Sequence, residues 1–241
     1  MVHDGSAPPN PDQRHQPVAS PHGDAPKSVE QHQPVAPPCG DAPPPPPFIG
    51  LTGAIAAGKS EALSALARLG AATLSTDELA HELLDDPEMR TRLAERWGDE
   101  VVVNGRVDRD RVGEIVFGSP EELAWLESVL HPLVGLRVAE WRSELPPDTA
   151  LAVVEVPLLF EAGLEGAFDA TVCVIAADGT RARRAAERGT ELLEGRSDRQ
   201  LSQDEKAARA THVIRNDGSL EELEHRLELL LPALTGIRGT A

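Results

Sequence analysis

A short apolar segment, FIGLTG at residues 48–53, leads directly into the loop GAIAAGKS at residues 53–60 and then into a segment with helical spacing. The loop fits the pattern G-x-x-x-x-G-K-[ST], in which successive backbone N–H groups point inward at a phosphate. In this pattern Lys59 reaches the outer phosphates, and the Ser60 hydroxyl is placed to coordinate Mg²⁺. The alternative is a chance Gly-Lys-Ser at a turn, but a strand before the loop and a helix after it favour a phosphate-binding loop.

Two positions of this loop differ from the glycines that such loops often contain. Ala54 and Ala56 occupy them here. Alanine resists a positive φ, so the loop will be strained, or will bind nucleotide less tightly, if either position requires that conformation.

The chain from residue 48 onward alternates short apolar strands with helical segments. Continuous apolar strands separated by helices indicate a parallel sheet that is covered on both faces, joined by right-handed crossovers. The predicted fold class is therefore α/β, with a central parallel sheet. Strands are expected at 48–53, 71–76, 150–160 with a stop at Pro157, 169–177 and 211–217. Helices are expected at 59–70, 77–84, 87–98, 106–117, 120–145, 178–210 and 219–234.

Two segments depart from the simple alternation. Residues from about 78 to 145 carry no strong strand signal and are too long for one crossover, so we expect a helical insertion there. Residues 1–47 are rich in proline, contain the imperfect repeat HQPVASPHGDAP and HQPVAPPCGDAP, and have few large apolar side chains. We expect a disordered tail, with a docking role for its prolines or a weak metal site at its histidines as alternatives.

The composition limits the possible partners. The net charge of −17 over 241 residues argues against a nucleic-acid or anionic-membrane surface, although a local site for a small anion is still possible. Cys39 and Cys173 form neither a metal-ligand spacing nor a disulfide framework. With no signal peptide or long apolar run, the expected location is the cytoplasm.

A carboxylate follows the second predicted strand. Asp77 lies after LST, and in a parallel sheet this position shares an edge with the phosphate loop. It could accept a proton from an attacking hydroxyl. The alternative is a carboxylate that stabilises a helix N-terminus, with Ser75 or Thr76 as the cap.

Two further groups of charged residues are candidates for the site. Arg184 and Arg188 are four residues apart, hence on one helix face, and would suit a lid over transferring phosphates at about residues 180–210. A solvated helix is the alternative, and it is our interpretation for Arg181 and Arg183. Glu155 ends a strand and could hold the magnesium shell through water, or could be a structural carboxylate.

The chain resembles the dephospho-CoA kinase family over residues 48 to 235. The resemblance is carried, in order, by IGLTGAIAAGKS, STDELAHELL, VDRDRVGEIVFGSPEELAWLESVLHPLV, VEVPLLFEAGLEGAFD, RARRAAERG and RQLSQDEKAARATHVIRNDGSLEEL. The family transfers the γ-phosphoryl group of ATP to the ribose 3′-hydroxyl of dephospho-CoA. The resemblance implies a P-loop kinase fold with a central parallel sheet, a helical insertion on the CoA side and an Arg-rich lid. It also implies ATP and dephospho-CoA as substrates with Mg²⁺ as cofactor, and we expect a monomer or weak homo-oligomer.

The resemblance also implies roles for individual residues. Asp77 matches the proposed catalytic base, and Arg184 and Arg188 match the lid arginines, with Lys59 on the phosphates and Ser60 on magnesium. His131, Pro157 and Leu158, together with Asp77, would lie on the acceptor side. The residues expected to bind ATP are Gly53, Ala54, Ile55, Ala56, Ala57, Gly58, Lys59, Ser60, Glu61 and Asn216.

Three differences separate the chain from the family pattern. Ser75 replaces the first Asp of the family's Asp-x-Asp, Glu155 stands where the family often has Asp, and the loop has alanines. Because Lys59, Asp77 and Arg184 are retained, we expect activity. The alternatives are another P-loop kinase for a small acceptor, or a regulator that binds ATP without transferring phosphate.

Overall fold

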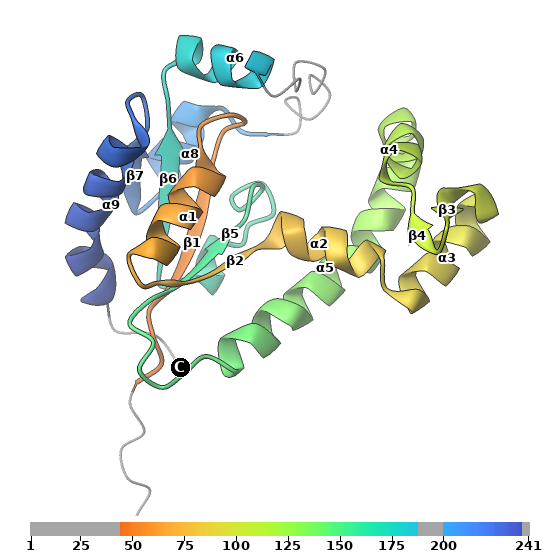
Figure 1. The fold of residues 1–241 in the computed structure, drawn as a ribbon, viewed down its shortest axis with the longest axis horizontal. Helices are drawn as coiled ribbons and strands as arrows, with labels where there is room; N and C mark the ends of the chain where they lie inside the picture. The colour runs from red at the N-terminus through yellow and green to blue at the C-terminus, as the bar shows by residue number, and fades with distance from the viewer. Residues whose placement is uncertain (1–43, 188–199, 238–241) are drawn as a thin grey trace, which may run out of the picture. The chain divides into compact units, whose positions relative to one another are not determined.

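A five-stranded parallel sheet forms the centre of the fold (Figure 1). A computed structural model describes residues 44–187 and 200–237. The strand order is β2-β5-β1-β6-β7, and every neighbouring pair is parallel. The predicted α/β class with a central parallel sheet is confirmed. The strands are β1 (Phe48–Gly53), β2 (Ala72–Ser75), β5 (Ala152–Glu155), β6 (Ala170–Ile175) and β7 (His212–Arg215).

The helices follow the predicted apolar periodicity closely. Several begin at a residue suited to a helix start: the Asp86 side chain caps α3, and Ser119 caps α5. The helix α1 ends at Arg68, and Gly70 two residues later has φ +92°, as expected for its predicted stop. The helices are α1 (Lys59–Arg68), α2 (Thr76–Leu84), α3 (Pro87–Trp97), α4 (Arg109–Gly118), α5 (Pro120–Ser143), α6 (Asp178–Glu187), α8 (Gln203–Arg209) and α9 (Leu220–Thr235), with short 3₁₀ turns at Asp99–Val101 and Glu165–Ala167.

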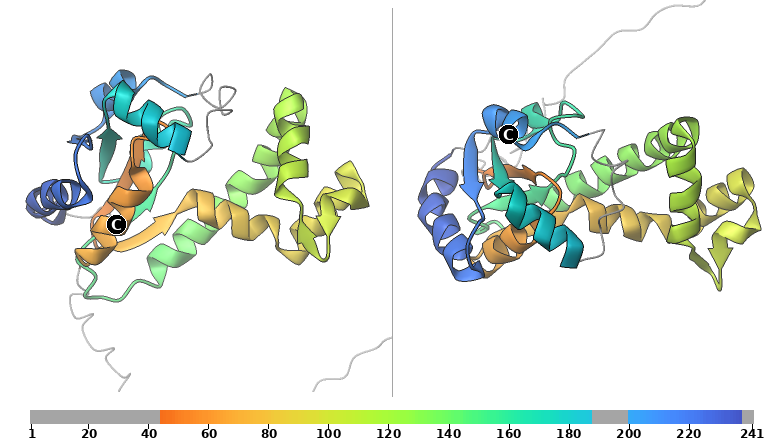
Figure 2. Two further views of the ribbon diagram at one scale, coloured as in Figure 1. Left: turned by 45° about the horizontal axis from the view of Figure 1, so that its top comes forward. Right: turned by 90° about the horizontal axis from the view of Figure 1, so that it is seen from above.

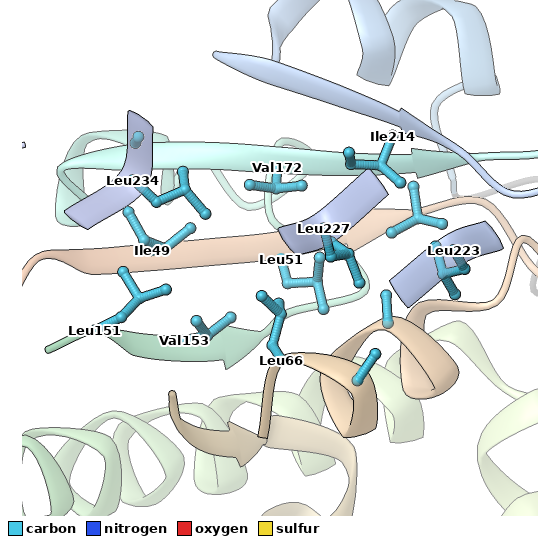
Figure 3. Close-up of a cluster of buried hydrophobic side chains, with 14 of the residues drawn as sticks. Ile49, Leu51, Leu66, Leu151, Val153, Val172, Ile214, Leu223, Leu227 and Leu234 are labelled. Atoms are coloured by element: carbon cyan, nitrogen blue, oxygen red, sulfur yellow. The ribbon is translucent and has the colours of Figure 1, made fainter. Parts of the chain in front are cut away.

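The two faces of the sheet bury different side chains. In β1, the side chains of Ile49 and Leu51 belong to the cluster against α1 and α9, whereas Phe48 belongs to a cluster on the other face. This alternation follows from the two-residue period of a strand. Figure 3 shows Leu66 of α1 and Leu223, Leu227 and Leu234 of α9 pointing toward the strand residues of the first cluster. Covering both faces explains why these strands are apolar at nearly every position.

The elements between β2 and β5 have their own apolar cluster. It includes Leu83 of α2, Leu93 of α3 and Leu126 of α5, all buried. Figure 2 shows α2 continuing directly from β2 and running beside α5, with which it is in contact. Within the described residues, no helix has both the length and the apolar content needed to cross a membrane.

One prediction for this region was wrong. The stretch that we expected to be helical throughout contains an antiparallel hairpin, β3 (Val102–Val103) with β4 (Arg106–Val107), and α4 begins only at Arg109. The turn residues Asn104 and Gly105 have φ of +51° and +75°. Asn-Gly with both residues left-handed is the preferred two-residue hairpin turn, and it overrides the helical spacing around it. The predictions for residues 1–43 and for Arg188 fall outside the described residues.

Candidate active site

The phosphate loop connects the central strand β1 to α1. Gly58 precedes α1 with φ +97° and ψ +35°, and its carbonyl accepts the hydrogen bond from the Ala62 N–H that starts the helix. The Ala57 N–H donates to the Ala54 carbonyl at 3.2 Å, which closes a turn inside the loop. The N-terminus of α1 therefore faces the loop, with the helix dipole positive at that end.

The two glycines of the motif are required by close contacts. A Cβ atom on Gly53 would lie 2.3 Å from the Val174 carbonyl oxygen, and one on Gly58 would lie 2.1 Å from Nδ2 of Asn216. Both glycines also have φ values that side chains disfavour, +155° and +97°. Of the two alanines noted in the sequence, Ala56 has φ +59° and Ala54 does not have a positive φ. The expected strain therefore falls on Ala56 alone.

Lys59 lies over the loop from the first turn of α1. Its Nζ donates to the Ala54 carbonyl at 3.2 Å. Burial lowers the pKa of its ammonium group, and the nearby Lys206 lowers it further, whereas the Glu155 and Asp77 carboxylates raise it. An ammonium group so placed can exchange a loop carbonyl for phosphate oxygens.

The strands β2 and β5 bring two carboxylates to the same edge of the sheet. Ser75 is paired in register with Glu155, and Glu155 is paired with Leu51 of the strand that leads into the loop. Asp77 follows in the first turn of α2, where it is exposed. Its charge affects the pKa of both Lys59 and Glu155, so Asp77 lies near both groups.

The hydroxyl groups at this edge bind Glu155 and do not cap α2. Ser75 is the residue before α2, but its side chain makes no cap hydrogen bond and binds the Glu155 carboxylate, which lowers the pKa of Glu155. The Thr76 hydroxyl donates to the Glu155 backbone carbonyl at 2.9 Å. The side chain of Glu155 is only 4% exposed, and burial, with the Asp77 charge, raises its pKa despite the opposing effect of Lys59.

Two arginines of α6 donate hydrogen bonds to backbone carbonyls of the phosphate loop. Arg184 donates to the Asn216 backbone carbonyl at 3.0 Å and to the Ala57 carbonyl at 3.4 Å. The buried Asn216 amide also donates to the Ala57 carbonyl, at 2.9 Å. Arg181 donates to the Ile55 carbonyl at 3.1 Å. Our interpretation of Arg181 as a solvated residue was therefore wrong, whereas Arg183 has a 67% exposed side chain.

The remaining predicted residues differ in how exposed they are. Ser60 is exposed and Glu61 half-buried, both in the first turn of α1, and Pro157 and Leu158 are half-buried in the turn after β5. His131 is exposed on α5, and the interactions that join the loop, Asp77 and Glu155 do not include it.

Lys206 is a buried charge that our reading of the sequence did not place in the site. It lies on α8 with no exposed surface, and it affects the pKa of Lys59. The available signal was its residue type, since only three residues of this arginine-rich chain are lysine. Its partners, Pro157 and Glu161, are distant from it in the sequence, so no local pattern reveals these contacts.

Comparisons with known proteins identify relatives that match most of the chain. A family model described as dephospho-CoA kinase matches residues 47–222. The dephospho-CoA kinase of Thermus thermophilus is 39% identical over 194 residues, 79% of this chain and 93% of that protein. The one from Deinococcus radiodurans is 38% identical over 190 residues, 77% and 91% of the two chains.

Solved structures show the same fold. The crystal structure of TT1252 from Thermus thermophilus, 39% identical in sequence, superposes with a TM-score of 0.67 over 79% of this chain and 99% of that one. A dephospho-CoA kinase from Campylobacter jejuni, 23% identical, shares the fold with a TM-score of 0.58 over 78% and 96% of the two chains. The resemblance predicted from the motifs is confirmed: the chain belongs to the dephospho-CoA kinase family and is an enzyme of the kinase class.

Proposed function

We propose that this chain transfers the γ-phosphoryl group of ATP to the ribose 3′-hydroxyl of dephospho-CoA, giving coenzyme A and ADP. The observation that carries the proposal is the strand register that brings the loop after β1, Glu155 at the end of β5 and Ser75 at the end of β2, two residues before Asp77, to one edge of the sheet. A phosphate-binding ammonium group beside a carboxylate is what transfer to an alcohol requires. Membership of the family supports dephospho-CoA as the acceptor.

ATP would bind with its phosphates in the loop between β1 and α1. The backbone N–H groups from Gly53 to Ser60 and the N-terminus of α1 would neutralise the phosphate oxygens. Lys59 would leave the Ala54 carbonyl and bind the outer phosphates. Asn216, which holds the Ala57 carbonyl, would keep the loop in shape on the adenine side.

The residues at this edge suit a hard divalent cation. Mg²⁺ prefers oxygen ligands and commonly takes most of them from substrate phosphates and water. The exposed hydroxyl of Ser60 would bind the ion directly, and the Glu155 carboxylate would hold it through water. When bound, Mg²⁺ neutralises charge on the β- and γ-phosphate oxygens.

The transfer step needs one proton acceptor. The acceptor's 3′-oxygen forms a bond to the γ-phosphorus while the bond from that phosphorus to the β–γ bridging oxygen breaks, and ADP leaves. The hydroxyl proton passes to the Asp77 carboxylate, which is exposed at the edge of the site. Arg184, and Arg188 beyond the described residues, would neutralise charge developing on the transferred group and help to exclude water.

An acceptor comparison tests this proposal. Purified enzyme would be supplied with ATP, Mg²⁺ and, in parallel, dephospho-CoA, AMP or a simple alcohol, and the products would be identified by mass spectrometry and phosphorus NMR. We expect a 3′-phosphate on dephospho-CoA and little reaction with the others. Preferred transfer to AMP or an alcohol would favour another small-acceptor kinase, and ATP binding without any transfer would favour a regulator.

A further inference from the structure

The turn after β5 is held by a charged group that the mechanism above does not use. Lys206 of α8 has no exposed surface. Its Nζ donates to the Pro157 carbonyl at 2.6 Å and lies 3.0 Å from Oε1 of Glu161. Burying an ammonium group is unfavourable unless it is paired and hydrogen-bonded, and both conditions are met by this one turn.

The Pro157 carbonyl is also bound from the sheet side. The hydroxyl of Thr52, a fully buried residue of β1, donates to the same carbonyl at 3.3 Å. Leu159 and Phe160, which follow in the same turn, are buried in the cluster on the sheet face opposite α1 and α9. The turn is therefore fixed between β1 and α8, while Pro157 and Leu158 remain half-exposed beside Glu155.

Glu161 extends this arrangement to the chain that follows residues 188–199. Its Oε1 accepts a hydrogen bond from the Leu201 N–H at 2.8 Å, in addition to pairing with Lys206. Leu201 lies directly before α8, whose start is fixed by a capping box between Ser202 and Glu205. The ion pair between Lys206 and Glu161 thus joins the turn at Pro157 to α8, which lies within the stretch predicted as the lid.

We propose that Lys206 is a positioning residue for the phosphoryl acceptor, which it serves by fixing the backbone at Pro157 and Leu158 through the Pro157 carbonyl and Glu161. The inference rests on the proposed function and on the family resemblance, which implies that Pro157 and Leu158 lie on the acceptor side. Lys206 is within electrostatic range of Lys59, which supports its place beside the site. Because transfer depends on acceptor placement within about an ångström, the ammonium group should matter most for the acceptor and least for ATP.

The first test replaces the ammonium group with an apolar side chain of similar length, Lys206→Met. We expect kcat/KM for dephospho-CoA to fall on the order of 100-fold, mostly through KM, while the Kd for ATP stays near the wild-type value. Asp204→Asn is the control, because Asp204 lies exposed on the same helix. It should leave both constants nearly unchanged.

A second variant separates positioning from folding. Lys206→Met with Glu161→Gln leaves no unpaired buried charge, so it should fold even if the single variant does not. It still lacks the donor to the Pro157 carbonyl, so a raised KM for dephospho-CoA with normal ATP binding is expected. A folded double variant with the wild-type KM for dephospho-CoA would overturn the inference. If the wild-type enzyme itself did not phosphorylate dephospho-CoA, the proposed function would fail instead.

Discussion

At the scale of single residues, a substitution at Asp77 separates the phosphoryl-transfer step from ATP binding. Replacing it with asparagine removes the proton acceptor while keeping its size. We expect Asp77→Asn to lower kcat by about 100- to 10,000-fold with little change in the Kd for ATP. The measurement is steady-state kinetics with dephospho-CoA beside a titration with an ATP analogue.

The neighbouring carboxylate supplies the control. Glu78 is exposed in the same first turn of α2, so Glu78→Gln should keep near wild-type turnover. If Asp77 only stabilised the helix N-terminus, Asp77→Asn would lower the free energy of unfolding by at most about 1 kcal/mol and leave turnover intact.

Glu155 predicts a pH dependence of stability. Its pKa is raised above the usual 4.5, so the folded protein holds this proton to a higher pH than the unfolded chain does. The stabilisation is complete below pH 4.5 and is lost as pH rises through the raised pKa. Because glutamine does not ionise, Glu155→Gln should gain stability relative to wild type over this interval.

Urea unfolding at several pH values between 4.5 and about 7.5 would measure the difference. The informative quantity is the slope of this difference with pH, because the raised pKa of Glu155 already includes the attraction of its ionised carboxylate to Lys59. Two parallel stability curves would contradict the raised pKa.

The site could be predicted from the sequence only where its residues are local. Lys59 and Ser60 belong to one loop motif, and Asp77 follows a strand whose end had to share the loop's edge of a parallel sheet. Arg181 and Lys206 could not be placed in this way. Each binds a carbonyl distant in the sequence, Ile55 for Arg181 and Pro157 for Lys206, and such contacts depend on how α6 and α8 pack.

At the scale of elements, the phosphate loop contains a residue whose backbone conformation is unfavourable. Ala56 has φ +59°, which costs an L-residue about 1–2 kcal/mol, whereas glycine adopts it freely at some cost in unfolded-chain entropy. We expect Ala56→Gly to raise the free energy of unfolding by up to about 1 kcal/mol. Chemical denaturation would measure it.

Ala54 is the matched control for this loop. It is buried and does not have a positive φ, so glycine there removes a packed methyl group with no relief of strain. Ala54→Gly should lower the free energy of unfolding by about 1 kcal/mol. Equal effects of the two substitutions would contradict the assignment of strain to Ala56.

The helix α6 presents arginines with different surroundings. Arg184 binds the loop carbonyl of Ala57 and the backbone of Asn216, whereas Arg183 is mostly exposed. We expect Arg184→Met to lower kcat/KM on the order of 100-fold or more, through lost charge stabilisation in transfer. Arg183→Met should have little effect, and similar losses in both variants would indicate a general effect of charge on α6.

The elements themselves were largely predictable, because apolar runs and helical spacing determine which residues the sheet and helices bury. The exception is the β3–β4 hairpin, where two positions with positive φ at Asn104 and Gly105 interrupt a helical pattern. The hairpin is attached to its surroundings by the Asp85 carboxylate, which accepts from the Val107 N–H at 3.0 Å. A short turn signal therefore outweighed the longer periodicity.

At the scale of the whole molecule, the proposed function places two substrates at one edge of the sheet. The strand β1 carries the phosphate loop, and its neighbour β5 leads to Glu155 and to the turn at Pro157. The next strand, β2, carries Ser75 and leads to Asp77. The boundaries of the tail at 1–47, the insertion at 78–145 and the lid at 180–210 stay predictions, as do the cytoplasmic location and the oligomeric state.

ADP release in the presence and absence of dephospho-CoA, with coenzyme A quantified in the same samples, measures the proposed phosphoryl transfer most directly. If the loop and the Asp77 carboxylate act on one acceptor, ADP should appear only with dephospho-CoA present, in equal amount to coenzyme A, and neither product should form with Lys59→Ala. Release of ADP at the same rate without the acceptor, or with no coenzyme A formed, would rule out phosphoryl transfer to dephospho-CoA.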